Sequence, residues 1–429
     1  MLSVIEGRDF LSKGLRILGI VRQSLVINSI NLMTATAISN VGGFVFWLLA
    51  ARLYTTESVG LASALTSSVT LVASLASLGL GFGIVHFHAS AKNNALEVIH
   101  ACMTITVLLS LLFGCIYLVG LPWWSPALAP LPGGGLTAVL FLLIAVLSNV
   151  GVLVSYIFMA IRHTGYLLVQ NIANGIVRVT LVVVATTFGV LGILSALAGS
   201  VVISVSLALV FFLPSVCAGY VPRLSLNWSP VRPLLKYAVA NHASALLWGL
   251  PGSLLPLIVV NYFGATSTAH FFIVWSMAAL IWAVPMAVSN SLFAEGSADV
   301  TRLRGHLRQA LWLSAGLVAA PVAIAILIGD KFLSFFGTSY AQEGTLLLQI
   351  LSITSFPSIL VYGYLGVLRV HRKLRELCFV TALVAFGGPT LAFILMPSAG
   401  LLSVALGHAL ALSLTGVVSA VRMRAMRLI

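Results

Sequence analysis

The feature that most constrains this chain is a succession of apolar runs, each about twenty residues or longer, that occupies almost its whole length. A helix needs about 20 apolar residues to cross the hydrocarbon core of a bilayer, which is about 30 Å thick. The sequence therefore predicts an all-α membrane protein with about twelve transmembrane helices. The predicted spans are Leu25–Leu53, Val59–His86, Val98–Leu121, Leu136–Ile161, Tyr166–Thr187, Leu191–Leu213, Leu234–Phe263, Ser267–Leu292, Leu307–Ile328, Thr345–Val370, Leu374–Met396 and Ala399–Val421.

Composition excludes a soluble fold. The 429 residues are 60% hydrophobic and 7% charged, whereas a soluble domain carries about 25% charged residues. The net charge of +13 would indicate nucleic-acid binding in a soluble protein. Here the basic residues lie between the apolar runs, so we expect no nucleic-acid partner and look to membrane topology for their explanation.

The positive-inside rule orients the predicted helices. With twelve spans and a cytoplasmic N-terminus, 19 of the 22 Lys and Arg residues fall in cytoplasmic segments; the other three are Arg52, Lys331 and the mid-span Arg178. An odd error in the helix count would destroy this separation. We therefore expect a multi-pass protein of the cell (inner or cytoplasmic) membrane with both termini in the cytoplasm. The 19 are Arg8, Lys13, Arg16, Arg22, Lys92, Arg162, Arg223, Arg232, Lys236, Arg302, Arg304, Arg308, Arg369, Arg372, Lys373, Arg375, Arg422, Arg424 and Arg427.

An internal repeat predicts two halves of six helices. The segment 48–54 (LLAARLY) at the end of the first run matches 257–263 (LIVVNYF) at the end of the seventh, at an offset of 209 residues. A second echo pairs 160–162 with 367–369, at an offset of 207. Similar offsets indicate two six-helix lobes of parallel orientation, pseudo-symmetric about an axis along the membrane normal and surrounding a central cavity.

These echoes give predicted domain boundaries. Residues 1–24 form a cytoplasmic amphipathic segment, because Glu6, Asp9, Lys13 and Arg16 share one helix face. The N-lobe occupies 25–215, a cytoplasmic linker with three prolines occupies 216–236, and the C-lobe occupies 237–429.

Three groups of short motifs stand out: Leu49-Ala50-Ala51-Arg52-Leu53 with Glu57-Ser58-Val59-Gly60; Leu78-Gly79-Leu80-Gly81; and Phe335-Phe336-Gly337 with Tyr340-Ala341, Leu347-Leu348 and Ile350-Leu351. They resemble the motifs of the oligosaccharidyl-lipid flippases, the polysaccharide biosynthesis or O-antigen-type flippases. This family lies within the multidrug/oligosaccharidyl-lipid/polysaccharide exporter superfamily, which also holds multidrug and toxic compound extrusion transporters and lipid II flippases. The resemblance departs from the family at Asn261, where the second-half repeat lacks a basic residue.

The resemblance implies a transporter that alternates between inward-open and outward-open states. Its implied substrate is a polyprenyl-diphosphate-linked oligosaccharide, carried from the cytoplasmic to the external leaflet for assembly of a cell-envelope polysaccharide such as lipopolysaccharide. Its implied partners are that lipid-linked substrate, the surrounding membrane lipids, and glycosyltransferases or a polymerase of the same pathway.

Arg178 is the strongest candidate for substrate binding. It is the only basic residue near the middle of a span, and all nine Asp and Glu residues lie in loops or at helix ends. An ionisable residue inside a membrane is costly and is a functional candidate for that reason. Asn171 and Asn174 share its helix face, with Gln170 adjacent. A guanidinium with neighbouring amides suits a diphosphate and sugar hydroxyls; the alternative is an Arg bonded to carbonyls or to another helix.

Other polar residues give weaker candidates. Asn40 in the first span is either a cavity-lining group or a packing residue, and Arg52 at its external end is either an anchor or a gate. Asn241 and His242 are expected at the cytoplasmic entrance, either meeting a headgroup or lying as interfacial polar residues. In the second span, the stripe Ser63, Ser67, Thr70, Ser74, Ser77 and Gly81 indicates either a cavity wall or, preferably, close helix packing.

No motif predicts an enzyme, a metal site or a cofactor. The four cysteines form no CxxC pair, and no nucleophile lies beside a base. Two other functions stay open. A multidrug exporter of the same superfamily is disfavoured by the lack of a mid-span carboxylate. A membrane polysaccharide polymerase or ligase is disfavoured by external loops of about 15 residues at most.

Overall fold

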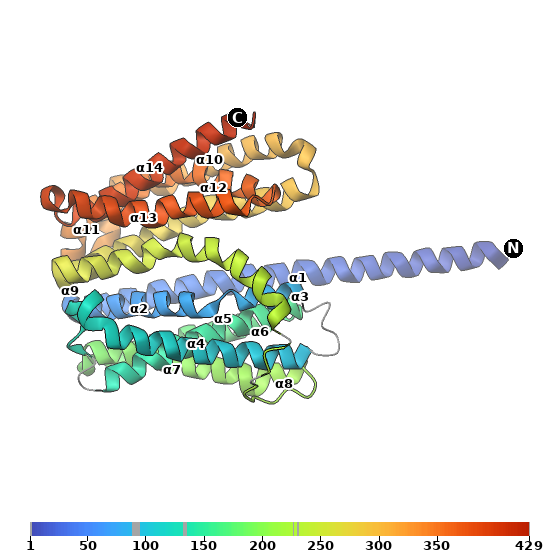
Figure 1. Ribbon diagram of the computed structural model, residues 1–429, viewed down its shortest axis with the longest axis horizontal. Coiled ribbons are helices and arrows are strands. Elements are labelled where there is room, and N and C mark those ends of the chain that lie inside the picture. Colours follow the sequence, from blue (N-terminus) through green and yellow to red (C-terminus); the bar gives the residue numbers. More distant parts are fainter. Residues whose placement is uncertain (1, 88–94, 132–134, 226, 230, 429) are drawn as a thin grey trace.

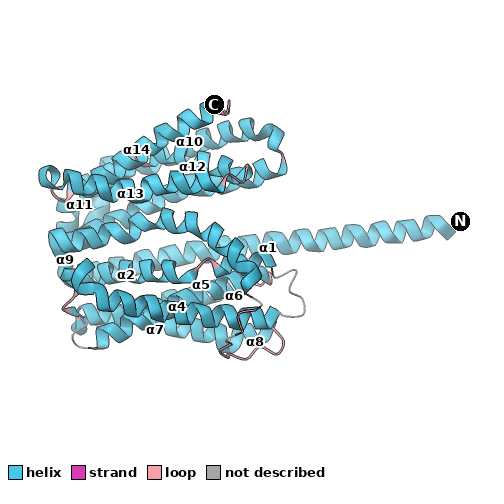
Figure 2. Ribbon diagram, viewed as in Figure 1, coloured by secondary structure: helices cyan, strands magenta, loops and turns pink. Residues whose placement is uncertain are grey.

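The computed structural model describes residues 2–87, 95–131, 135–225, 227–229 and 231–428; within the helices, the side chains of residues 2–26, 29, 86, 87, 236, 237, 240 and 241 are not described. The described chain is helical almost throughout (Figure 2), as the apolar runs predict. The N-terminal half contains α1 (Leu2–Leu53), α2 (Thr56–Ser77), α3 (Leu80–Phe87), α4 (Ala95–Trp124), α5 (Leu136–Ala160), α6 (Thr164–Val184), α7 (Val190–Leu207) and α8 (Leu213–Val216), with short elements at Pro126–Leu128, Thr186–Phe188 and Ala208–Phe212.

The C-terminal half begins with α9, which is the longest helix of the described chain. Figure 1 shows α9, in yellow, between the other helices of this half and the blue-green helices of the N-terminal half. The half contains α9 (Arg232–Ala298), a short helix at Val300–Arg302, α10 (Leu303–Ser334), α11 (Thr338–Ile353), α12 (Ser355–Val370), α13 (Leu374–Ala399) and α14 (Leu402–Ala425).

The described chain contains 11 helical segments long and apolar enough to span a membrane. One of them, His242–Ala298, has 57 residues, which corresponds to about 85 Å at 1.5 Å per residue. Gly264 interrupts it with φ 81° and ψ 176°, a conformation that glycine adopts without steric cost. The segment therefore crosses twice, and the described residues make the twelve crossings that the sequence predicts. An even number of crossings places both ends of the chain on the same side.

The backbone confirms that the halves are structural repeats. Gly189 (φ 53°, ψ −129°) and Gly400 (φ 52°, ψ −134°) occupy the turns before α7 and α14 in the same conformation. Arg162 (φ 60°) and Arg372 (φ 55°) occupy equivalent turns after α5 and α12. The structural equivalent of Arg162 is thus Arg372, at an offset of 210 residues. The sequence echo paired Arg162 with Arg369, a position three residues earlier. A shift of three residues keeps a helix nearly in phase, so the apolar pattern could not detect it.

A break in the second crossing shapes the space beside it. Leu78 (φ 45°) and Gly79 (φ 69°) end α2 before α3 begins. A Cβ at Gly79 would lie 2.5 Å from the carbonyl oxygen of Ala238 on α9. Only glycine therefore allows α9 to approach the break this closely, and the approach brings His242 beside the end of α2.

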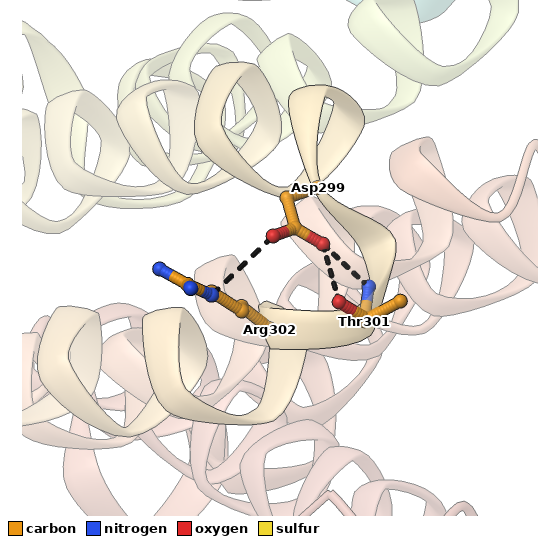
Figure 3. Close-up of polar contacts among 3 residues, drawn as sticks. All are labelled: Asp299, Thr301 and Arg302. Carbon is orange, nitrogen blue, oxygen red and sulfur yellow. Dashed lines mark hydrogen bonds and ion pairs between the residues drawn. The ribbon is translucent and has the colours of Figure 1, made fainter.

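The turn between α9 and α10 is held by its own side chains (Figure 3). Asp299 accepts hydrogen bonds from the backbone nitrogen (3.0 Å) and the hydroxyl (2.6 Å) of Thr301. The Nε of Arg302 lies 3.5 Å from the other carboxylate oxygen. The hydrogen bond from the Thr301 hydroxyl holds the pKa of Asp299 below its usual value. The backbone hydrogen bonds from Thr301 and Arg302 and the charge of Arg302 lower this pKa further. Asp299 is therefore a helix cap at an exposed turn.

Candidate functional site

A cavity of about 460 Å³ lies among the helices of the N-terminal half and the first part of α9. This volume is within the range of about 300–1,000 Å³ typical of small-molecule sites. The wall contains residues of α1, α2, α3, α4, α5, α6, α7 and α9. Its polar residues are Thr66, Thr70, Ser74, Ser77, Thr106, Ser148, Asn149, Tyr156, Arg178 and His242.

Arg178 is the one charged residue among those that line this cavity. Its guanidinium carbon lies 5.5 Å from the centre of the buried Phe46 ring on α1. Its Nε atom is buried without a hydrogen-bond partner, and no carboxylate of the described residues forms an ion pair with it. A cation–π contact contributes about 0.5–2 kcal/mol, whereas an Arg at the centre of a membrane helix costs about 2.5–3.5 kcal/mol on insertion scales. The contact with Phe46 therefore offsets only part of that cost.

The amide side chains predicted to bind substrate together with Arg178 include two that hydrogen-bond to neighbouring helices in this structure. Asn171 donates to the carbonyl oxygen of Ala35 on α1 (3.0 Å), and Asn174 donates to the hydroxyl of Ser204 on α7 (3.1 Å). Neither is among the residues that line the cavity, nor is Gln170, which is 5% exposed and has an unpartnered Oε1 atom. The structure therefore brings Arg178 into the cavity without these three residues.

Asn149 on α5 is the amide that lines the cavity with Arg178, and the sequence reasoning missed it. It is buried and donates to the hydroxyl of Ser110 on α4 (2.9 Å). Thr106, on the same wall, has a buried hydroxyl with no partner among the described residues. A single Asn within an apolar run was the available signal, but its direction could not be known without the packing of α4 against α5.

His242 faces the break after α2. Its Nε2 atom lies 2.7 Å from the carbonyl oxygen of Ser74 and 3.1 Å from the hydroxyl of Ser77. The side chain of Asn241 is outside the described residues. Asn40 on α1 is exposed and is not among the lining residues. Of these three candidates, the structure places His242 at the cavity.

The polar stripe of α2 divides into two parts. Ser63 and Ser67 are buried and donate to carbonyl oxygens of their own helix, at 2.8 and 2.9 Å. Farther along, Thr70, Ser74 and Ser77 line the cavity. The first part of this stripe is therefore buried in helix packing, and the second part forms a cavity wall.

Arg52 joins the two halves at the end of the molecule away from the break in the second crossing. Its Nε donates to the carbonyl oxygen of Phe335 (2.5 Å), and a terminal nitrogen donates to that of Ser334 (2.8 Å), where α10 ends. Unpaired carbonyls make a helix C-terminus partially negative, so a guanidinium is favourable there.

Asn261 makes the matching contact from the other half. Its Nδ2 atom lies 3.2 Å from the hydroxyl of Ser125 and 3.4 Å from the carbonyl oxygen of Trp124, where α4 ends. Its Oδ1 atom accepts from the backbone nitrogen of Ala127 (3.2 Å). The structure thus explains why an amide can replace the basic residue at this repeat position: it donates to α4 and also accepts from the following turn.

Comparison with known structures identifies the fold. The protein superposes on a structure described as the inward-facing conformation of a multidrug resistance MATE family transporter of the MOP superfamily, with TM-score 0.72, 16% identity and coverage of 94% of this chain and 98% of that one. It superposes on the lipid II flippase MurJ in an inward closed conformation with TM-score 0.70, 14% identity and coverage of 94% and 87%. An outward-facing MATE family transporter gives TM-score 0.62, 15% identity and coverage of 94% and 96%. At sequence identities of 14–16%, these similarities establish the fold that the chain shares with these proteins.

Sequence comparison supplies the family. No curated protein matches the sequence significantly. The model of the family described as "Polysaccharide biosynthesis protein" matches residues 25–269, more than half of the 429 residues. The protein is therefore a multi-pass membrane protein that belongs to the polysaccharide biosynthesis protein family, and it has the fold seen in the MATE transporter and MurJ flippase structures.

Proposed function

We propose that this protein moves a polyprenyl-diphosphate-linked oligosaccharide from the cytoplasmic to the external leaflet by alternating access. The observation that carries this proposal is the guanidinium of Arg178, which lines a cavity of about 460 Å³ with no acidic residue in its wall. A diphosphate is the anion such a group binds well, because Arg pairs with two phosphate oxygens at once. The hydroxyl and amide groups of Thr106, Ser148 and Asn149 supply partners for the polar part of the substrate.

The family assignment supports the same class of substrate. The chain belongs to a family named for polysaccharide biosynthesis, and one structure of the same fold is described as a lipid II flippase. Export of a polysaccharide precursor requires that a charged, sugar-bearing headgroup cross the membrane in a water-accessible cavity. Arg178 would compensate the headgroup charge during that passage.

The second candidate function is export of multiple drugs, because other structures of the fold are described as multidrug transporters. The charge of the cavity weighs against it for cationic drugs. Arg178 would repel a cation, and none of the lining residues is an Asp or Glu that could attract one.

We propose that this structure represents an inward-facing state of the transport cycle. The TM-score is higher with the inward-facing MATE structure than with the outward-facing one, 0.72 against 0.62. The contacts of Arg52 and Asn261 lie at the opposite end and join the halves there. In the outward-open state these contacts would separate, while the surfaces at the cytoplasmic end come together.

Complementation of a deletion strain tests this function. The strain lacks the gene for this protein and carries it on a plasmid. Cells without the plasmid should accumulate lipid-linked oligosaccharide on the cytoplasmic leaflet and lose the surface polysaccharide, while the plasmid restores export. Normal export without the protein, combined with increased sensitivity to organic cations, would support the multidrug function instead.

A further inference from the structure

A second cavity, of about 250 Å³, lies within the C-terminal half and is lined by aromatic rings. Trp275 and Trp282 have ring centres 4.9 Å apart, and the ring of His408 lies 4.8 Å from the first and 5.3 Å from the second. Trp248 and Tyr362 form a second pair at 4.7 Å. The sequence reasoning did not anticipate this cluster, because its members come from both arms of α9 and from α12 and α14.

The aromatic cavity also contains polar groups that could serve a ligand. Trp248 donates to the hydroxyl of Tyr362 (3.1 Å), and Trp282 donates to that of Thr354 (3.0 Å). The indole nitrogen of Trp275, in contrast, donates no hydrogen bond within the described part of the chain, and it lies 3.3 Å from where a Cβ would stand on Gly252, another lining residue. His408 is 4% exposed, and its Nδ1 atom is buried without a hydrogen bond. The N–H group of Trp275 at the cavity wall is therefore available to a ligand, whereas the buried Nδ1 atom of His408 lies next to Gly388 of α13, which is not among the lining residues.

The chemistry of the wall favours a sugar ring. An organic cation would bind aromatic faces, but no Asp or Glu lines the cavity to neutralise it. An acyl chain would leave the N–H donor of Trp275 unpaired, at a cost in free energy. A pyranose matches both features: its C–H groups lie against the negative face of an indole, and its hydroxyls pair with the polar atoms. The volume, just below the usual range of about 300–1,000 Å³, suits one ring.

The two cavities share a helix. Ala245 and Leu246 of α9 line the cavity that holds Arg178, whereas Trp248, Gly249 and Gly252 line the aromatic cavity. These residues fall within two turns of one helix, about 10 Å at 1.5 Å per residue. In a polyprenyl-diphosphate sugar, the first sugar is bonded directly to the diphosphate, so adjacent sites for the two groups fit such a substrate.

We infer that the cavity formed by Trp248, Trp275, Trp282, Tyr362 and His408 is a binding site for a single sugar ring of the transported lipid-linked oligosaccharide. This inference rests on the proposed function. It assigns charge recognition to the N-terminal half, through Arg178, and sugar recognition to the C-terminal half. A substrate bound to both would contact the two bodies that move relative to each other during transport.

Equilibrium binding to the purified full-length protein in lipid nanodiscs tests the inference. The probes are a radiolabelled polyprenyl diphosphate without sugar and the same lipid carrying one glucose, galactose or N-acetylglucosamine. At least one sugar-bearing probe should bind roughly tenfold more tightly than the bare diphosphate, a difference of about 1.4 kcal/mol. Trp275→Ala should remove this gain and leave binding of the bare diphosphate unchanged.

Two further variants protect the test against misfolding and nonspecific effects. Gly249→Leu adds a side chain at a lining position where a Cβ would meet nothing within 4 Å, so it should fill the cavity and remove the gain without deleting an aromatic ring. Trp312→Ala removes a Trp that is 72% exposed on α10 and lies outside the cavity; it should leave both affinities unchanged.

The outcomes separate this inference from the proposed function. If no sugar-bearing probe binds more tightly than the bare diphosphate, or if Trp275→Ala and Gly249→Leu both keep the gain, the aromatic cavity is not a sugar site. Binding of tetraphenylphosphonium that is lost in Trp275→Ala, without any sugar-dependent gain, would assign the cavity to organic cations. Unchanged binding of the bare diphosphate by Arg178→Ala would instead contradict the proposed role of Arg178.

Discussion

Arg52 and Asn261 occupy equivalent positions in the two halves, 209 residues apart, and each hydrogen-bonds to the end of a helix in the opposite half. Their partners are equivalent too: Ser334 follows Ser125 by the same 209 residues. The fold thus joins its halves by two contacts related by the internal pseudo-symmetry. In one contact, the guanidinium of Arg52 donates to the carbonyl oxygens of Ser334 and Phe335. In the other, the amide of Asn261 hydrogen-bonds to Trp124, Ser125 and Ala127.

Removing these contacts should favour the outward-open state. A hydrogen bond contributes about 1 kcal/mol net, so Arg52→Ala and Asn261→Ala should each increase the outward-open population by about fivefold, and the double variant should increase it further. Ser63→Cys, introduced in a background without native cysteines, places a thiol at a buried position on α2. Its rate of labelling by an impermeant maleimide added from outside measures the opening.

A matched control uses an ion pair at the other end of the molecule. Arg302→Ala removes the contact with Asp299 in the turn between α9 and α10 and should leave the labelling rate unchanged. Labelling that is equally slow in the parent, Arg52→Ala and Asn261→Ala proteins would show that the two contacts do not hold the external side closed.

Gly60 permits a close approach between α2 and α9. A Cβ added there would lie 1.7 Å from the carbonyl oxygen of Ala265, a backbone atom that cannot rotate away. Gly60→Ala should therefore push the helices apart and destabilise the protein by roughly 1–3 kcal/mol, as overpacking does. Gly43→Ala on α1 is the matched control, since its Cβ would meet nothing within 4 Å. Thermal unfolding in detergent should show a lower midpoint for Gly60→Ala alone; equal midpoints would contradict this packing.

The orientation of the chain can be tested independently of transport. The separation of 19 of the 22 basic residues predicts that reporters fused after Arg427, Ala127 and Arg304 lie inside, outside and inside, respectively. Alkaline phosphatase, active only outside, and green fluorescent protein, fluorescent inside, report the two locations. An active phosphatase at Arg304 would reverse the orientation of the C-terminal half.

The crossings could be predicted from the sequence because the length of an apolar run is a local property. The twelve crossings follow from it. The partners of Asn171 and Asn174 could not be predicted, because they depend on α1 and α7, which are distant in sequence. On a helical wheel these amides lie on the same face as Arg178. In the packed structure, the amide that lines the cavity with Arg178 is Asn149. The cluster around Trp275 escaped prediction for the same reason.

The central claim is that Arg178 binds the diphosphate of a lipid-linked oligosaccharide, and substitution at this position in reconstituted vesicles tests it most directly. The assay measures transfer of a fluorescent polyprenyl-diphosphate disaccharide between leaflets, with equal amounts of inserted protein confirmed by immunoblot. Arg178→Ala should insert normally and abolish transfer. Arg178→Lys should retain partial transfer, because it keeps the charge but loses the planar pair of donors. Transfer by normally inserted Arg178→Ala at the rate of the parent protein would contradict the account and leave Arg178 as a structural residue.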